Sequence, residues 1–378
     1  MTDTVTLEAN GVGGPSFVTF AVEGFTSVSI RNSIVEPAEV SVELGDDTGW
    51  DRLSSLTGLG SEYQVYVNDR PRMRGRVEAV DSPTDAGKGT VQRLVVRTKL
   101  SDAIYSSAPA GIRMRDITIK DFILSCYASV GLTETDFDFR GDVSRDLMTG
   151  RGSRGQRPPI AIERIKTDQA KVQPNETIFV AVDRHLRRHG FLHFDGADGR
   201  IVVAAPDDQQ DPLYFFRAYK ERQLAQVNNV VSVQRGLDVS GSPTHLGVFG
   251  KSWKADFTKA KIGSVLFNPD LIAAGFNRRI VIIDEGLRSR AFAERRASRE
   301  FAARNRGLER LTIVSDGLSY REGGDVIPFA PDTVADVLVS EMGGALGAYF
   351  VESVQMDRSA SGGDLTTLVM VRQGVWEL

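Results

Sequence analysis

The chain has 378 residues, which is enough for two or three domains. With 41% hydrophobic and 25% charged residues it can build real cores, so wholesale disorder is excluded. The net charge of −4 argues against a nucleic-acid coat protein, which would be basic. A single cysteine excludes an intrachain disulfide framework and a zinc site built from several cysteines, and four histidines leave little material for a His-based catalytic centre.

The first residues do not combine a basic region with an apolar core, so we expect no secretory signal. No stretch approaches the roughly 18 apolar residues that a spanning helix needs, so we expect no membrane anchor. We therefore expect a chain that folds in a cytosol.

Residues 5–98 have the pattern of β-strands. Residues 40–44 alternate strictly between apolar and polar side chains, as in a half-buried strand. Residues 76–80 and 91–96 flank a polar tip at 85–89. Several short strands joined by polar hairpins indicate an antiparallel barrel or sandwich.

The period changes near residue 112, where an amphipathic helix is predicted. Its apolar stripe contains residues 119, 122, 123, 126, 127 and 130. Thr118 and Asp121 resemble a capping box, and Gly131 is a suitable terminator. Cys126 lies within the stripe, so we interpret it as a core thiol.

Residues 140–174 are polar and rich in arginine, proline and glycine, which predicts a long loop or arm. A second helix follows, with Asn175 as its cap and Gly190 after its end. A hairpin is predicted over 191–203. These elements predict a small α+β unit.

From residue 209 the β pattern returns, interrupted by a predicted helix at 287–306. This helix carries seven arginines: Arg288, Arg290, Arg295, Arg296, Arg299, Arg304 and Arg306. One interpretation is a solvated helix with the pairs Arg296–Glu300 and Glu300–Arg304. The alternatives are nucleic-acid binding and pairing with acidic surface on a neighbouring subunit.

The chain contains a weak internal repeat. After a shift of 274 residues, residues 76–98 match residues 350–372 at seven of 23 positions, where average residue usage gives roughly one or two. Residues 65–69 also resemble 337–341, with a slip of two residues. Two unrelated hairpins of common design are the alternative, and we favour two related β domains.

Two apparent motifs lack the context that their chemistry needs. Residues 150–155 match G-x-G-x-x-G, but no buried strand precedes them and no helix follows, so no dinucleotide cofactor is expected. His185 and His189 lack a third metal ligand, and with His193 we interpret them as surface histidines near a helix end. No nucleophile elbow and no glycosidase-like carboxylate pair is found, so we predict no enzyme and no cofactor.

The order of these elements resembles the baseplate hub proteins of contractile-tailed phages, the late control protein D family, with Mu-like hubs most similar. The resemblance is carried by residues 25–34 and 38–42, by 175–183 with 190–192 and 198–203, by 293–306 with 311–314 and Gly317, and by 351–371. One departure is Val96-Arg97-Thr98-Lys99, where many members of the family have Gly-Arg-Asp. It affects the placement of the end of the first domain.

This resemblance implies a mainly β fold with an α+β insert, and a homotrimer. Two antiparallel β-barrel domains of the tail-tube type, at 1–105 and 209–378, would form a ring of pseudo-sixfold symmetry. The α+β domain, 106–208, would project to one side. The ring would adapt the sixfold tail tube to the threefold central spike in the virion baseplate, after assembly in the bacterial host cytoplasm.

The expected partners are the tail tube protein, the spike, other baseplate proteins, and DNA in transit through the channel. We place Arg288, Arg295, Arg296 and Arg299 at a subunit boundary, and Arg151, Arg154 and Arg157 on a partner-facing arm. The first 50 residues hold eight acidic residues and one basic residue, which makes them a candidate channel lining. A phage cell-wall hydrolase and the hub of a non-phage contractile injection system are the alternatives.

Overall fold

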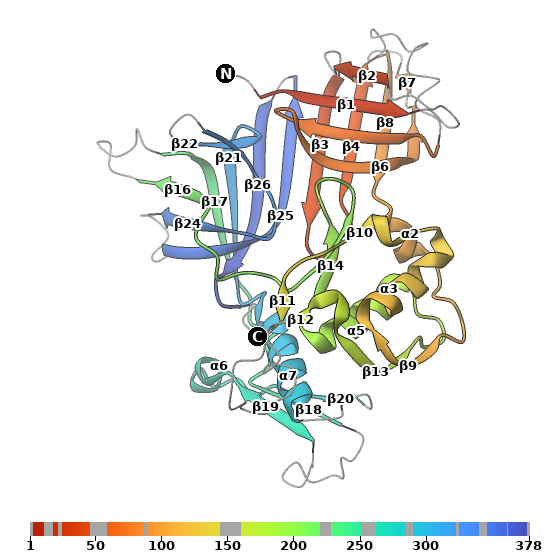
Figure 1. Cartoon of the computed structure of the whole chain (residues 1–378). Helices are drawn as coiled ribbons and strands as arrows, with labels where there is room; N and C mark the ends of the chain where they lie inside the picture. Colours follow the sequence, from red (N-terminus) through yellow and green to blue (C-terminus); the bar gives the residue numbers. More distant parts are fainter. Residues whose placement is uncertain are drawn as a thin grey trace.

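The computed structural model describes residues 3–10, 18–21, 25–45, 59–82, 84–85, 89–143, 160–219, 228–250, 262–284, 287, 290–322, 325–339, 346–360 and 362–375. Two β units lie side by side, and two smaller units that contain helices lie below them in the view of Figure 1. The chain passes from the first β unit through the larger helical unit to the second β unit, which contains the smaller one as an insertion.

The first β unit follows the alternation of apolar and polar residues that the sequence shows. Its strands are β1 (Val5–Asn10), β2 (Val18–Ala21), β3 (Phe25–Ser33), β4 (Glu39–Gly45), β5 (Glu62–Val67), β6 (Arg70–Asp81), β7 (Thr84–Asp85) and β8 (Gly89–Arg97). They pair in the order β3-β4-β8-β6-β5-β1-β2, with β7 beside β8. Alternate side chains, such as Val40 and Val42, are fully buried because successive residues of a strand point to opposite faces.

The second β unit is built in the same way. Its main strands are β16 (Tyr214–Ala218), β17 (Val230–Leu237), β21 (Glu309–Asp316), β24 (Thr333–Val339), β25 (Leu346–Ser359) and β26 (Gly363–Arg372). They pair in the order β17-β21-β26-β25-β24-β16, and β22 (Ser319–Glu322) with β23 (Asp325–Pro328) forms a separate hairpin. Each of the six main strands therefore has a counterpart at the same place in the first unit.

The structure confirms the internal repeat down to its hydrogen-bond register. In the first unit Val77 lies opposite Val96 and Ala79 opposite Val95, so Glu78 is the extra residue of a β-bulge. After the shift of 274 residues, Val351 lies opposite Met370 and Ser353 opposite Val369, so Glu352 is the extra residue. One pairing differs, since β1 is antiparallel to β5 whereas β16 is parallel to β24.

The two β units form one continuous sheet, and the described strands close into no barrel. The resemblance implied two antiparallel β-barrel domains, and in this respect the described part of the chain differs. The outer strand of the first unit, β3, pairs with β25 from Ser33 opposite Ser353 to Ser27 opposite Ser359. Because β3 uses its free edge in this way, the strands join in a single sheet of 14 strands over one shared core.

The larger helical unit has its own core, which contains Cys126. Its elements are α2 (Leu100–Tyr105), β9 (Arg113–Thr118), α3 (Ile119–Tyr127), η1 (Ala128–Val130), η2 (Glu134–Asp136), β10 (Phe137–Phe139), β11 (Asp142–Val143), β12 (Ile160–Ala161), η3 (Ile162–Arg164), β13 (Lys166–Lys171), α5 (Ile178–His189), β14 (Leu192–Asp195) and β15 (Ile201–Ala204). The predicted cap Thr118 is confirmed. The predicted cap Asn175 is wrong, because Thr177 accepts the N–H of Val180.

The smaller unit is an insertion between β17 and β21 that the sequence did not predict as a separate unit. It consists of β18 (His245–Phe249), β19 (Gly263–Phe267), α6 (Pro269–Ala273), β20 (Arg279–Ile283) and α7 (Arg290–Asn305). The strands pair in the order β19-β18-β20, and α7 packs on one face of this sheet. Helix α7 is the predicted arginine-rich helix. Within the described residues, no helix is both long and apolar enough to cross a membrane.

Candidate functional site

Helix α7 lies between the three-stranded sheet of its own unit and the larger helical unit, where it packs against α5 (Figure 1). Arg299 is only 4% exposed, and its Nη1 donates to the carbonyl oxygen of Phe191 over 2.7 Å. Burial lowers the pKa of Arg299 to about 9, with the Arg187 charge acting in the same direction. This arginine therefore ties α7 to the start of β14.

The two ion pairs predicted within this helix are confirmed. Glu300 lies 2.8 Å from Arg296 and 3.8 Å from Arg304. The guanidinium of Arg295 lies 5.9 Å from the centre of the Phe292 ring. Three of the four predicted interface arginines thus make contacts within their own chain, while their role at a subunit boundary stays a prediction.

The remaining predicted site residues lie outside the described residues. They are Arg288 and the three arginines of the predicted arm, Arg151, Arg154 and Arg157. The G-x-G-x-x-G segment at 150–155 lies outside them as well.

The interpretation of the three clustered histidines as surface residues is wrong. His185, His189 and His193 are 3%, 7% and 3% exposed, because α5 is covered by α3 and α7. Their rings pack against Phe122, Phe292 and Phe179 at centroid distances of 4.5, 5.7 and 4.3 Å, respectively. Burial lowers the pKa of His193 to about 4. The described residues contain no group of three or more His, Cys, Asp or Glu that could hold a metal ion.

Cys126 has the position that the helix pattern predicts. Its side chain is fully buried on α3, and burial raises the pKa of the thiol to about 12. A thiol that is almost never ionised is a poor nucleophile, so the structure assigns it to the core.

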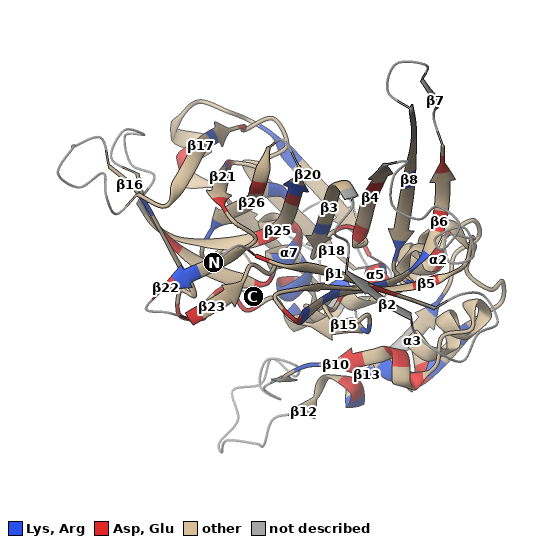
Figure 2. Ribbon diagram, turned by 90° about the horizontal axis from the view of Figure 1, so that it is seen from above, with Lys and Arg blue, Asp and Glu red and all other residues tan. Residues whose placement is uncertain are grey.

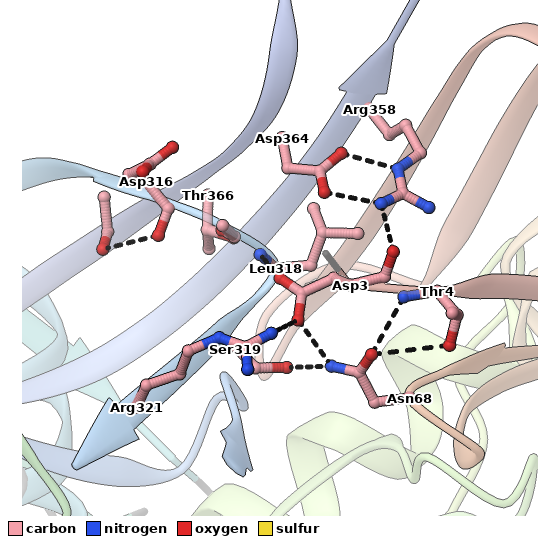
Figure 3. A network of polar contacts seen from close by, with 12 residues as sticks. Asp3, Thr4, Asn68, Asp316, Leu318, Ser319, Arg321, Arg358, Asp364 and Thr366 are labelled. Carbon is pink, nitrogen blue, oxygen red and sulfur yellow. Dashed lines mark hydrogen bonds and ion pairs between the residues drawn. The ribbon is translucent and has the colours of Figure 1, made fainter. Parts of the chain in front are cut away.

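A polar network joins the beginning of the described chain to the second β unit (Figure 3). The carboxylate of Asp3 accepts the backbone N–H of Leu318 over 2.6 Å and the amide of Asn68 over 2.7 Å, and it pairs with Arg321. Asn68 also donates to Ser319 Oγ over 2.9 Å. Because Asp3 is 5% exposed, these contacts fix one β unit against the other in a partly dry environment.

A second junction joins the larger helical unit to the first β unit through Asp195 at the end of β14. Its Oδ2 accepts the backbone N–H of Ala38 over 2.8 Å and the hydroxyl of Thr98 over 2.7 Å. The carboxylate is buried, which raises its pKa to about 6 despite both hydrogen bonds. No sequence pattern indicates this role, since an aspartate at a hairpin usually stays in water.

Within the predicted channel lining, residues 1–50, two of the described carboxylates form ion pairs across strands. Acidic and basic residues are interspersed over both β units (Figure 2). Glu39 and Glu43 on β4 each lie 2.7 Å from an arginine of β8, Arg97 and Arg93 respectively. These cross-strand pairs neutralise two of the eight acidic charges in the first 50 residues.

No family model matches this sequence, and no curated protein matches it. Among solved structures, the chain is similar to a tail protein from Neisseria meningitidis, with 15% identity, a TM-score of 0.73 and coverage of 100% of this chain and 98% of the other. A 43 kDa tail protein of prophage MuSo2 from Shewanella oneidensis has 14% identity, a TM-score of 0.73 and 99% coverage of both chains.

A component of the type VI secretion system of E. coli, described as structurally similar to the T4 tail proteins gp27 and gp5, has 9% identity and a TM-score of 0.55. The similarity covers 98% of this chain and 78% of the other. At these identities the likeness concerns the fold. The resemblance found in the sequence therefore extends to the three-dimensional structure, and the chain has the fold of phage tail proteins.

Proposed function

We propose that the chain is the structural baseplate hub of a contractile phage tail, without a catalytic role. Three copies would form a ring that adapts the sixfold tail tube to the threefold central spike and leaves a channel for DNA. The observation that carries this proposal is the duplicated β unit. Because each chain contains two units of the same strand order, three chains supply six of them.

In this proposal the β regions, residues 1–105 and 209–378, form the ring, and the α+β region, 106–208, meets the spike or the surrounding baseplate. The tail tube, the spike and other baseplate proteins are the proposed partners. The proposed location is the virion tail, after assembly in the host cytoplasm.

The outermost strand of the second β unit supports association of this kind. Strand β17 ends the path of the continuous sheet, and its Val231 and Leu237 are 60% and 67% exposed. An exposed apolar edge strand can pair with another chain, because its backbone N–H and C=O groups are free on one side. We propose that a neighbouring subunit covers this edge, and that Arg288, Arg295 and Arg296 lie at the same boundary.

The test is the mass in solution of the purified chain, alone and with the spike protein. A trimer in either condition supports the proposal, because a hub can need its partner to assemble. A monomer in both conditions contradicts it. The double variant Val231→Asp/Leu237→Asp should shift the trimer toward monomer. Tyr105→Asp, at a residue 71% exposed, is the matched control and should leave it unchanged.

The hub of a non-phage contractile system is the second candidate, favoured by the likeness to the E. coli secretion component. Both candidates predict a trimer, so the location of the chain decides between them. Its recovery in DNA-containing particles after phage induction supports the phage hub, and recovery only in particles without DNA supports the alternative. A wall hydrolase would instead cleave peptidoglycan, and we expect no cleavage.

A further inference from the structure

A cavity of about 340 Å³ lies where three parts of the molecule meet. Helix α5 contributes Phe179, Asp183 and Arg187, which recur every four residues on one face of the helix. Helix α7 and the residue just beyond it contribute polar side chains from the opposite side, and β14 and the segment after β3 complete the walls. The polar lining residues from these elements are Arg299, Glu300, Arg304, Arg306 and His193.

The lining carries more positive than negative charge. It contains four arginines and two carboxylates, those of Asp183 and Glu300. Asp183 lies 2.6 Å from Arg187, and Glu300 is shared between Arg304 and Arg296, which lies outside the lining. Both carboxylates of the lining are therefore already paired with arginines other than Arg299.

Arg306 lies 3.5 Å from Glu352, so Arg299 is the one arginine of the lining that has no ion pair among the described residues. The Nη1 of Arg299 donates to the neutral carbonyl of Phe191, and its Nη2 has no hydrogen-bond partner among the described residues. His193 lines the same cavity with both ring nitrogens unpartnered in the described structure. Leaving buried donors unsatisfied costs free energy, and two such side chains here border one cavity.

The electrostatics agree with this geometry. The charge of Arg187 adds to the effect of burial in lowering the pKa of Arg299, and Asp183 and Glu300 only partly oppose it. A negative ligand in the cavity would relieve the repulsion among these arginines. Guanidinium groups suit phosphate because their planar forks present parallel N–H donors to its oxygens.

We propose that this cavity binds a small free oxyanion of the phosphate class, held by Arg299 at its buried wall and by Arg304 at its partly exposed side. The side chain of Arg304 is 38% exposed, which gives the anion a route from solvent. A bound anion would link α5, α7 and β14. This proposal does not depend on the proposed function, because it concerns the single chain.

Binding is measured by calorimetry and by the thermal midpoint of the full chain in sodium phosphate at pH 7.5, against sodium chloride and sodium acetate at equal ionic strength. We expect phosphate alone to raise the midpoint and to give saturable heat. Equal midpoints in phosphate and chloride would show a cavity filled by water and overturn the proposal. An equal rise in acetate would also overturn it, since the site would then prefer a carboxylate.

Two variants on α7 locate the site. Arg304→Gln should weaken phosphate binding about tenfold, which is the effect of losing one charge-assisted hydrogen bond. Arg290→Gln is the matched control, because Arg290 is 79% exposed on the same helix and lies outside the cavity. Unchanged phosphate affinity in Arg304→Gln contradicts the proposal. Arg299→Met should abolish phosphate binding. If Arg299→Met does not fold, the phosphate affinity of Arg304→Gln tests the proposal.

Discussion

Glu78 and Glu352 occupy equivalent positions as the extra residues of β-bulges in the two β units. In β25 the bulge changes which residues face the core, because one extra residue reverses the alternation of side chains. The residues that enter the shared core lie on both sides of it: Tyr349, Val351, Val354 and Met356. The bulge therefore lets one long strand keep the same core face along its length.

Deletion of Glu352 should prevent stable folding. Without the extra residue, either the part of β25 before the bulge or the part after it would present its apolar side chains to the wrong face. We expect loss of soluble protein or a non-cooperative thermal transition by circular dichroism. The control is Glu352→Gln, which keeps the chain length and should retain a cooperative transition. A deletion variant that melts like the wild type would contradict the role of the bulge.

Asp195 and His193, two residues apart on β14, should affect stability with opposite dependence on pH. Folding raises the pKa of Asp195 from 3.8 to about 6, so its contribution to stability falls as pH rises through that window. Folding lowers the pKa of His193 from 6.5 to about 4, so its contribution falls as pH drops from 6.5 to 4. Each effect corresponds to about 3 kcal/mol, and in the wild type they largely cancel.

Urea denaturation between pH 4 and 7 separates the two effects. Burial also raises the pKa of Asp332 to about 6, which adds a fall with pH that all variants share, so each profile is compared with that of the wild type. Relative to the wild type, the free energy of unfolding of Asp195→Asn should rise with pH from 4 to 6, and that of His193→Phe should fall from pH 4 to 6.5. The double variant is the control, and its difference from the wild type should change little with pH. Parallel pH profiles for the two single variants would contradict this account.

The local elements could be predicted because their signals lie within short segments. The stripe that contains Cys126, the cap Thr118 and the hairpin at 191–203 each depend on neighbouring residues, and the structure has them. The repeat was detectable because a hairpin keeps its apolar pattern and its bulge together. The joining of the two units was not detectable, because β3 and β25 pair across more than 300 residues and no local pattern encodes such a partner.

The site was harder to predict than the fold. Arg299 and His193 have the sequence context of exposed polar residues. The packing of α7 against α5 buries Arg299, and His193 is buried beside the rings of Phe179 and Tyr127. Likewise, Asp195 acquires its role from Ala38 and Thr98, which precede it by 157 and 97 residues. Burial of a polar side chain is a property of the assembled units, so sequence patterns that report on one element miss it.

Cys126 should resist thiol reagents in the folded protein. Because burial raises the pKa of this thiol to about 12, the reactive thiolate is scarce at pH 8 and the side chain is inaccessible. We expect labelling by a disulfide reagent to be complete in denaturing urea and to follow the rate of unfolding in buffer. Cys126→Ala should show no labelling in either condition. Rapid labelling in buffer would show that the core around α3 opens.

Asn68 should stabilise the junction of the two β units through both its side chain and its backbone. Its φ of +51° is in the left-handed region, in a two-residue turn between β5 and β6. Asn68→Gly keeps this turn but removes the bonds to Asp3 and Ser319, which should cost about 1 to 2 kcal/mol. Asn68→Ala loses the same bonds and adds about 1 kcal/mol of backbone strain, so it should be the less stable variant in urea denaturation. Asp69→Gly, in the same turn at φ +59°, is the control and should be close to wild type in stability. If Asn68→Gly were as stable as the wild type, the bonds of Asn68 to Asp3 and Ser319 would not stabilise the junction.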